Sequence, residues 1–244
     1  LFQFFHIHRA EPSFLCFRFR SLYNRVYHDT GVELKLELRL QIAPAILNRI
    51  PSFKVGAVLY QGFEINGSPQ MLEGRLRLFQ ESLFFDYADR SIEDESAVKE
   101  WHDAFRELNP SFSGRESGLE RMLEDIKEQR FVEPKNSAVD LSRFFSLKYL
   151  IPVHIYDARN LKGPIKIEPG GPDEIITFSD DAGAFGTITE NLSLHHAGAD
   201  TKDALQLVFF RPSLSKEEAS RLLDSLTKMF EQIHGGRHIS AVFP

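Results

Sequence analysis

The residue with the clearest capacity for chemistry is His154, which lies in the segment Pro152-Val-His-Ile-Tyr-Asp157. The apolar residues around it predict a β-strand, in which alternate side chains face the same way. A histidine on such a strand is either a core residue, hydrogen-bonded to Asp157 or to the backbone, or a pocket residue that orients a substrate group or a water. The residues alone leave both interpretations open.

Two further histidines, His195 and His196, precede Asp200 and resemble a set of metal ligands. Adjacent residues on a strand point to opposite faces, so two neighbouring histidines rarely bind one ion. We interpret this segment as a solvated loop and predict neither a metal site nor a cofactor. The sequence also contains no phosphate-binding loop, nucleophile elbow or zinc-protease motif.

The charge distribution disfavours strong, independent binding to nucleic acid. The chain has 29 basic and 35 acidic side chains, and residues 32–244 carry a net charge of −8. Binding to nucleic acid depends on Lys and Arg side chains that neutralise phosphates, and an acidic body supplies few of them. A weak contact would use a local set of arginines: Arg75, Arg77, Arg115 and Arg121.

The single cysteine, Cys16, excludes an internal disulfide and favours a reducing compartment, so we expect a cytoplasmic protein. No apolar run approaches the roughly 18 residues of a membrane-spanning helix, and we expect no membrane partner. The oligomeric state stays open.

Two parts of the chain differ in composition. Residues 1–31 contain four Arg, three His and six Phe without a clean helical or strand period. We predict that this segment is a leader, poorly ordered or non-native, with a targeting peptide as the alternative. Residues 32–244 read as one domain.

Hydrophobic periodicity predicts the elements of that domain. A strand with alternating leucines covers residues 34–42, and a second strand covers 53–60. Three boxes of the Ser-x-x-acid type predict helix starts at Ser91, Ser117 and Ser215. The other helices are expected at 70–87 and 139–147, and short strands at 153–156, 165–167, 175–178, 185–189 and 205–210. The fold class is therefore α+β (mixed α/β), with a helical first half and a mainly antiparallel or mixed sheet in the second half.

Several of these segments, in this order, resemble a known module. They are Pro134-Lys-Asn-Ser-Ala-Val-Asp140, Pro152-Val-His-Ile-Tyr-Asp157, Leu161-Lys-Gly-Pro-Ile165 and Leu205-Gln-Leu-Val-Phe-Phe-Arg-Pro212. Together they are similar to the B3/B4 module of the bacterial phenylalanyl-tRNA synthetase β chain and to its free-standing relatives, over about residues 95–235. The resemblance implies a single B3/B4-like tRNA-binding domain over residues 32–244.

In the synthetase, this module hydrolyses tyrosine wrongly esterified to the phenylalanine tRNA. The resemblance implies that His154 is the catalytic histidine, where an imidazole can hold the terminal ribose or position a water. Gln206 falls where the family has a glutamate that accepts a hydrogen bond from the tyrosine hydroxyl. The substrate-binding candidates are thus Gln206, Asp157 and Asn136, although Asp157 is a candidate only by its position.

Two classes of function follow. The first is an aminoacyl-tRNA ester hydrolase that edits in trans, as part of translation quality control; it requires His154 and Gln206 to converge in one pocket. The second is a non-catalytic module that binds RNA, such as tRNA, or an amino-acid-like ligand. ATP-dependent ligation is excluded, because the chain has no room for an aminoacylation domain.

Overall fold

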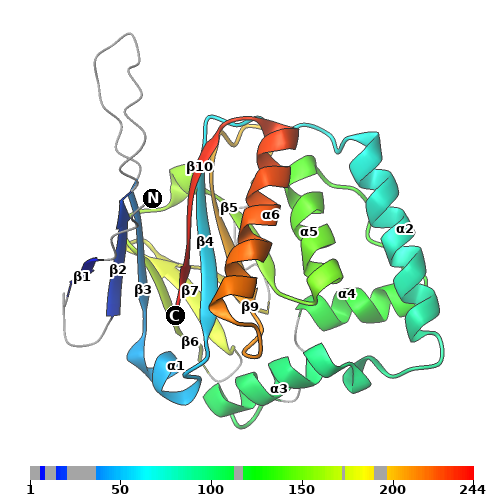
Figure 1. Cartoon of the computed structure of the whole chain (residues 1–244), viewed down its shortest axis with the longest axis horizontal. Helices are drawn as coiled ribbons and strands as arrows, with labels where there is room; N and C mark the ends of the chain where they lie inside the picture. The colour runs from blue at the N-terminus through cyan, green and yellow to red at the C-terminus, as the bar shows by residue number, and fades with distance from the viewer. Residues whose placement is uncertain (1–5, 9–14, 21–36, 113–117, 172–173, 190–196) are drawn as a thin grey trace.

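A computed structural model of the chain describes residues 6–8, 15–20, 37–112, 118–171, 174–189 and 197–244 (Figure 1). It contains a six-stranded sheet and a four-stranded sheet, with helices beside the four-stranded one. In Figure 1 the six-stranded sheet lies at the left, and α6, α5 and α2 follow one another to the right of the four-stranded sheet. This arrangement confirms the predicted α+β class.

The six-stranded sheet has the order β1-β2-β3-β6-β7-β8. Its neighbours are antiparallel except for the parallel pair β3 and β6. The strands β1 and β2 belong to the predicted leader, most of which lies outside the described residues. The bounds are His6–His8 (β1), Leu15–Arg20 (β2), Glu37–Ile42 (β3), Ile165–Pro169 (β6), Ile176–Asp180 (β7) and Gly183–Thr187 (β8).

The four-stranded sheet is antiparallel throughout and has the order β10-β4-β9-β5. Its bounds are Lys54–Gln61 (β4), Val153–Asp157 (β5), Asp203–Phe210 (β9) and Arg237–Phe243 (β10). On β9, Phe209 faces the other sheet, where it stacks on Phe178 of β7 with ring centroids 5.2 Å apart. Gln206 lies three residues before Phe209 on the same strand, an odd spacing that points it to the opposite face, toward the helices.

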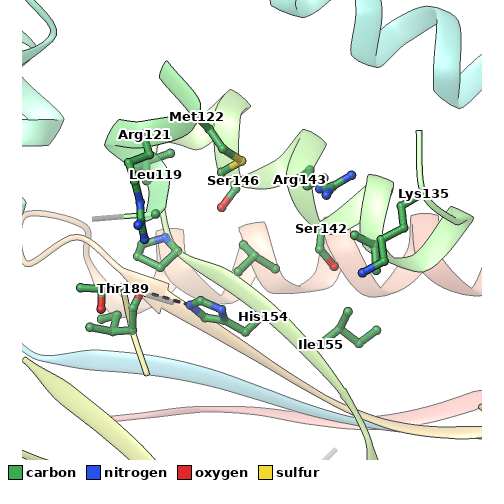
Figure 2. A pocket seen from close by; sticks show the side chains of 15 residues that line it. Leu119, Arg121, Met122, Lys135, Ser142, Arg143, Ser146, His154, Ile155 and Thr189 are labelled. Atoms are coloured by element: carbon green, nitrogen blue, oxygen red, sulfur yellow. Dashed lines mark hydrogen bonds between the residues drawn. The ribbon is translucent and has the colours of Figure 1, made fainter. Parts of the chain in front are cut away.

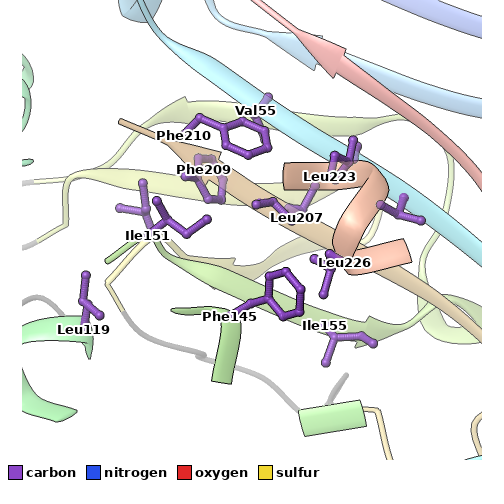
Figure 3. Packing of buried hydrophobic residues seen from close by; sticks show 14 of the residues in the cluster. Val55, Leu119, Phe145, Ile151, Ile155, Leu207, Phe209, Phe210, Leu223 and Leu226 are labelled. Atoms are coloured by element: carbon purple, nitrogen blue, oxygen red, sulfur yellow. The ribbon is translucent and has the colours of Figure 1, made fainter. Parts of the chain in front are cut away.

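The helices α5, α6, α2 and α4 form layers on the opposite face of this sheet. Both α5 and α6 pack on its strands, and α2 and α4 pack against α5. Figure 3 shows the resulting core, in which Phe145 of α5 and Leu223 and Leu226 of α6 are buried. The bounds are Pro44–Arg49 (α1), Gln70–Tyr87 (α2), Ile92–Asp94 (η1), Ser96–Leu108 (α3), Gly118–Lys127 (α4), Ser137–Tyr149 (α5), Ala158–Asn160 (η2) and Lys216–His234 (α6).

The structure corrects one prediction about these elements and adds one strand. The capping box at Ser215 is confirmed, but Ser91 makes no side-chain cap and precedes only the short 3₁₀ helix η1; α3 begins at Ser96. Ser117 lies outside the described residues. Strand β10 was not predicted at all, because its short apolar alternation follows two glycines that indicate only a helix end. Among the described helices, none is long and apolar enough to cross a membrane.

Candidate functional site

A pocket of about 300 Å³ opens beside β5, one of the two edge strands of the four-stranded sheet (Figure 2). One wall comes from α4, a second from α5, and the third from β5 and the residues that follow β8. Because an edge strand is uncovered on one side, the pocket reaches both faces of β5, and the adjacent residues His154 and Ile155 both line it.

The charged side chains of this pocket are all basic. Arg121 of α4, Lys135 before α5 and Arg143 of α5 line it together with His154, and its described lining contains no Asp or Glu (Figure 2). The described lining therefore presents three cations and no carboxylate of its own, with Arg143 paired to the buried Asp140 outside the lining, and this excess of positive charge suits the pocket to an anionic group.

Two of these cations are set in place by the buried carboxylate of Asp140. Arg143 donates from Nη1 to Asp140 Oδ1 at 3.2 Å and to the carbonyl oxygen of Glu133 at 3.1 Å. The backbone N–H of Lys135 donates to both oxygens of Asp140, at 3.1 and 3.0 Å, and Ser68 donates its hydroxyl at 2.6 Å. The ammonium group of Lys135 takes no part in these bonds and stays exposed at the pocket rim.

The structure places His154 in the pocket wall and also gives it a structural contact. Its Nε2 lies 3.2 Å from the carbonyl oxygen of Ile188. A carbonyl oxygen only accepts, so Nε2 carries the proton and donates. The ring also packs between the sheets, with Phe178 and Phe209 at centroid distances of 5.6 and 6.2 Å. Both interpretations of His154 are therefore partly correct: the side chain lines the pocket, and it also donates a hydrogen bond to the backbone.

Gln206 does not share this position. The antiparallel register of β5 and β9 pairs Gln206 with Ile155, whereas His154 pairs with Leu207. Paired residues point to the same face and neighbouring residues to opposite faces, so Gln206 points toward the helices and His154 toward the other sheet. The convergence of His154 with Gln206, which the hydrolase hypothesis requires, is absent.

The amide of Gln206 is fully buried, and both its nitrogen and its oxygen make a hydrogen bond. Its Nε2 donates to Ser142 Oγ at 2.9 Å, and its Oε1 accepts from the hydroxyl of Tyr60 at 3.0 Å. Burial raises the pKa of Tyr60 well above its usual value, and the nearby Glu231 raises it further, so Tyr60 remains a donor. Gln206 reaches the pocket only indirectly, because Ser142 lines it.

The other two substrate-binding candidates perform local structural roles. Asp157 caps η2 by accepting from the backbone N–H of Arg159 at 2.9 Å, and it also accepts from the hydroxyl of Thr201 at 2.8 Å. Burial alone would raise the pKa of Asp157, but the hydrogen bonds from Arg159 and Thr201 hold it below its usual value. Asn136 caps α5 by accepting from the N–H of Val139 at 2.9 Å. Neither side chain lines the pocket.

Two contacts attach α4, which forms one wall of the pocket, to the rest of the protein. The N–H of Gly118 donates to the carbonyl oxygen of Thr189 at 2.9 Å, and a Cβ at position 118 would lie 2.5 Å from that oxygen. The second point is the buried pair of His102 Nε2 and Glu120 Oε1, 2.6 Å apart. Burial raises the pKa of Glu120, although His102 acts to lower it.

Sequence reasoning missed most of the lining residues. It named Arg121 only for a weak RNA contact, and it included neither Lys135 nor Arg143 among the site residues. One signal was present: Val139, Ser142, Arg143 and Ser146 recur at helical spacing and share the pocket face of α5. His195 and His196, which we interpret from the sequence as part of a solvated loop, lie outside the described residues. Within the described residues, no cluster of three or more His, Cys, Asp or Glu side chains is placed to hold a metal ion.

Comparison with known proteins gives one informative relationship. No family model matches the chain. The chain is 49% identical over 201 residues to the uncharacterized protein YhzB of Bacillus subtilis (strain 168), an alignment that covers 82% of this chain and 97% of that protein.

Proposed function

The chain belongs to the family of the Bacillus subtilis protein YhzB, whose name assigns no activity. From the residues that line the pocket, we propose that this protein is a B3/B4-type module that binds a small amino-acid-like ligand. In this proposal the module is non-catalytic and holds the ligand by its carboxylate. The observation that carries it is the set of three cations, Arg121, Lys135 and Arg143, without an acidic residue in the described lining.

The chemistry of the lining supports a ligand with one anionic end and one apolar end. Guanidinium and ammonium groups form short, strong hydrogen bonds to carboxylates. Apolar side chains, among them Leu119, Met122 and Ile155, provide contact area for the rest of the ligand. A volume of about 300 Å³ is at the small end of ligand pockets, which favours a molecule of amino-acid size over a larger cofactor.

The test is to titrate the protein with L-tyrosine and L-phenylalanine and with the corresponding amino alcohols, and to follow binding by calorimetry and chemical-shift changes. We expect binding of the amino acids but not of the alcohols, which lack the carboxylate. Lys135→Gln removes one cation without touching the backbone bond to Asp140, and we expect it to weaken binding about 3- to 10-fold.

Lys228→Gln is the matched control, because Lys228 is an exposed lysine on α6, outside the pocket. We expect this variant to bind as the unmodified protein does. Equal binding of amino acid and alcohol, or equal affinities of the two lysine variants, would contradict the carboxylate role of the pocket.

The form of the hydrolase that needs both His154 and Gln206 fails, because the two side chains do not converge. The second candidate is therefore hydrolysis of mischarged aminoacyl-tRNA in trans by a site that uses His154 alone, and the observation that favours it is the place of His154 in the pocket wall. With Gln206 turned away, such an activity would have to recognise its substrate without the amide of Gln206. Binding of the tRNA end for this reaction would also bring its terminal ribose and phosphate close to Arg121, Lys135 and Arg143.

Deacylation of tyrosine-charged phenylalanine tRNA tests this candidate. His154→Gln retains a side-chain donor for the carbonyl of Ile188 but removes the imidazole, so it separates support of the wall from catalysis. Loss of deacylation in this variant, with folding unchanged, would establish the hydrolase. No deacylation by the unmodified protein, across several aminoacyl-tRNAs, would leave the binding module.

A further inference from the structure

A second pocket lies where α5 ends and α6 begins, between two helices that pack side by side (Figure 1). Its volume is about 380 Å³, and it shares no lining residue with the pocket beside β5. We call it the α6 pocket, and it is lined by Tyr149, Arg211, Leu214, Glu218, Arg221, Leu222 and Ser225.

Two cations reach this pocket from different segments of the chain. Arg211 directly follows the end of β9, and Arg221 lies in the first half of α6. The α6 residues of the lining are spaced three and four positions apart, so they share one face of the helix. Arg211 meets that face from the connection that leads into α6.

The guanidinium group of Arg211 has little to bind within the protein. Its side chain is only 26% exposed, and its Nε is enclosed without a hydrogen-bond partner. Its Nη1 lies 3.8 Å from Glu100 Oε2, which is beyond hydrogen-bond distance. The carboxylate of Glu100 instead accepts from the backbone N–H and the hydroxyl of Ser213. Arg211 is therefore a largely buried cation that has no hydrogen-bond acceptor among the described residues.

Arg221 is exposed and makes no ion pair with a described residue. The only carboxylate in the described lining, that of Glu218, accepts from the backbone N–H of Ser215 at 2.8 Å as part of the capping box. The pKa of Glu218 lies below its usual value, first because of its hydrogen bonds with Ser215 and then because of the charges of Arg221 and Arg211. Two guanidinium groups and one carboxylate leave the lining with an excess of positive charge.

An oxyanion between the two arginines would supply the missing acceptor. A buried cation without a hydrogen bond costs free energy in the unliganded protein, and a bound acceptor offsets that cost. A phosphate monoester suits two guanidinium groups better than a carboxylate does, because it offers three acceptor oxygens and up to two negative charges. Lys148, whose ammonium nitrogen lies 5.1 Å from the centre of the Tyr149 ring, adds a third cation beside the pocket.

The rest of the surroundings favours a small ligand over a nucleic acid strand. Tyr149, Leu214 and Leu222 are partly buried and offer contact area to an organic group. Glu217 and Asp224 are exposed on the same helix, so the additional phosphates of a strand would meet acidic side chains. One phosphate with an attached organic group avoids that repulsion.

We propose that the α6 pocket binds a small phosphate monoester, with the phosphate between Arg211 and Arg221 and the organic group against Tyr149, Leu214 and Leu222. This site uses none of the residues that line the pocket beside β5, so it does not depend on the function of that pocket.

The test is a titration with phenyl phosphate, followed through the NMR signal of the Arg211 Nε–H group. This Nε is enclosed, so the ligand meets the Nη groups and the Nε–H reports on the same guanidinium. We expect a saturable shift with phenyl phosphate, binding about 10-fold weaker with inorganic phosphate, which lacks the ring, and no shift with benzyl alcohol, which lacks the charge.

Two variants and two controls assign the shift to this pocket. Arg221→Gln should weaken binding about 10-fold, because it removes one of the two guanidinium groups. Lys228→Gln, which removes a charge from an exposed position of the same helix, and Lys135→Gln, in the pocket beside β5, should leave it unchanged. Arg211→Met should abolish binding without lowering the unfolding midpoint, because Arg211 has no hydrogen bond to lose.

Four results would overturn the proposal. The first is an Arg211 signal that does not move up to about 20 mM phenyl phosphate. The second is equal binding by Arg221→Gln and Lys228→Gln, since the two arginines would then not share the ligand. The third is a lower unfolding midpoint of Arg211→Met, which would mean that Arg211 stabilises the unliganded protein. The fourth is binding of a short single-stranded RNA without binding of phenyl phosphate, which would assign the pocket to nucleic acid.

Discussion

His154 and Gln206 occupy neighbouring strands and point to opposite faces of the sheet that they share, because the register aligns Gln206 with Ile155. The imidazole of His154 and the amide of Gln206, which the sequence analysis assigns to one site, are therefore on different sides of the sheet. His154 is in contact with the pocket, whereas Gln206 is enclosed by Tyr60 and Ser142 on the helical side. His154 is therefore open to a ligand of the pocket, whereas Gln206 is connected to the pocket only through Ser142.

The first prediction concerns Gln206→Glu, which restores the residue type that the resemblance implies. We expect this variant to destabilise the protein by about 2–4 kcal/mol at pH 8, because a buried carboxylate has no proton to donate to Ser142. Chemical denaturation measures the free energy of unfolding. The loss should shrink toward pH 5, since burial raises the pKa of the new carboxyl and the protonated form regains a donor.

The control for this substitution is Gln70→Glu at the exposed start of α2, which should change the free energy of unfolding by less than about 0.5 kcal/mol. Equal stability of Gln206→Glu and the unmodified protein at pH 8 would mean that the side chain at position 206 reaches water.

The second prediction concerns Gly118→Ala at the start of α4. The new Cβ would lie 2.5 Å from the carbonyl oxygen of Thr189, closer than van der Waals contact allows, so α4 must move away from the end of β8. We expect a loss of about 1–3 kcal/mol in the free energy of unfolding. We also expect weaker binding in the pocket, because Arg121 is carried by the same helix.

Gly74→Ala is the matched control, since a Cβ there meets nothing within 4 Å and alanine favours a helix. It should leave the protein equally or slightly more stable. If both glycine variants behave alike in denaturation, the close approach of Gly118 to Thr189 does not constrain the fold.

The third prediction compares two serines that the sequence presents in the same way. The Ser215 hydroxyl accepts from the N–H of Glu218, and the Glu218 carboxylate accepts from the N–H of Ser215. Ser91 makes no side-chain cap. Ser215→Ala should therefore reduce the free energy of unfolding by about 1 kcal/mol, and Ser91→Ala by less than about 0.5 kcal/mol. Equal losses in thermal or chemical denaturation would contradict the difference in capping.

The fourth prediction is a pH dependence caused by His234, which is buried at the end of α6. Its Nδ1 donates to the carbonyl oxygen of Phe230 at 2.9 Å, and its Nε2 lies 2.8 Å from the hydroxyl of Ser137. Burial lowers the pKa of His234 from 6.5, although the bond to Phe230 opposes the shift. The unfolded chain therefore takes up this proton at a higher pH than the folded chain does.

The stability contributed by neutral His234 is fully present above pH 6.5 and is lost as the pH falls toward the folded pKa. We expect a slope of at most about 1.4 kcal/mol per pH unit from this group. The experiment compares unfolding between pH 7 and pH 5 for the unmodified protein and for His234→Gln. Glu120, whose pKa is raised, acts in the opposite direction in both proteins, so their difference isolates His234. Identical slopes would contradict this role.

Hydrophobic periodicity and capping boxes predicted a helix or its start correctly where the stabilising interaction joins residues close in sequence. The helix predicted at residues 70–87 has those bounds in the structure, and the box at Ser215 forms because its two partners are three residues apart. The equivalent signal at Ser91 precedes only the short η1, in which Ile92 is buried and which packs against α3 and α4, and Ser91 makes no side-chain cap.

By itself, the sequence determined the α+β class and most helices and strands, among them the strand that carries His154. Hydrophobic periodicity and capping residues predict these features, because both depend on residues that are close together in the sequence. Only the tertiary structure decided that Gln206 faces away from His154, and that Arg121, Lys135 and Arg143 surround one pocket. The physical reason is that a shift of one residue in strand register reverses every side chain, and that register depends on packing between segments about fifty residues apart.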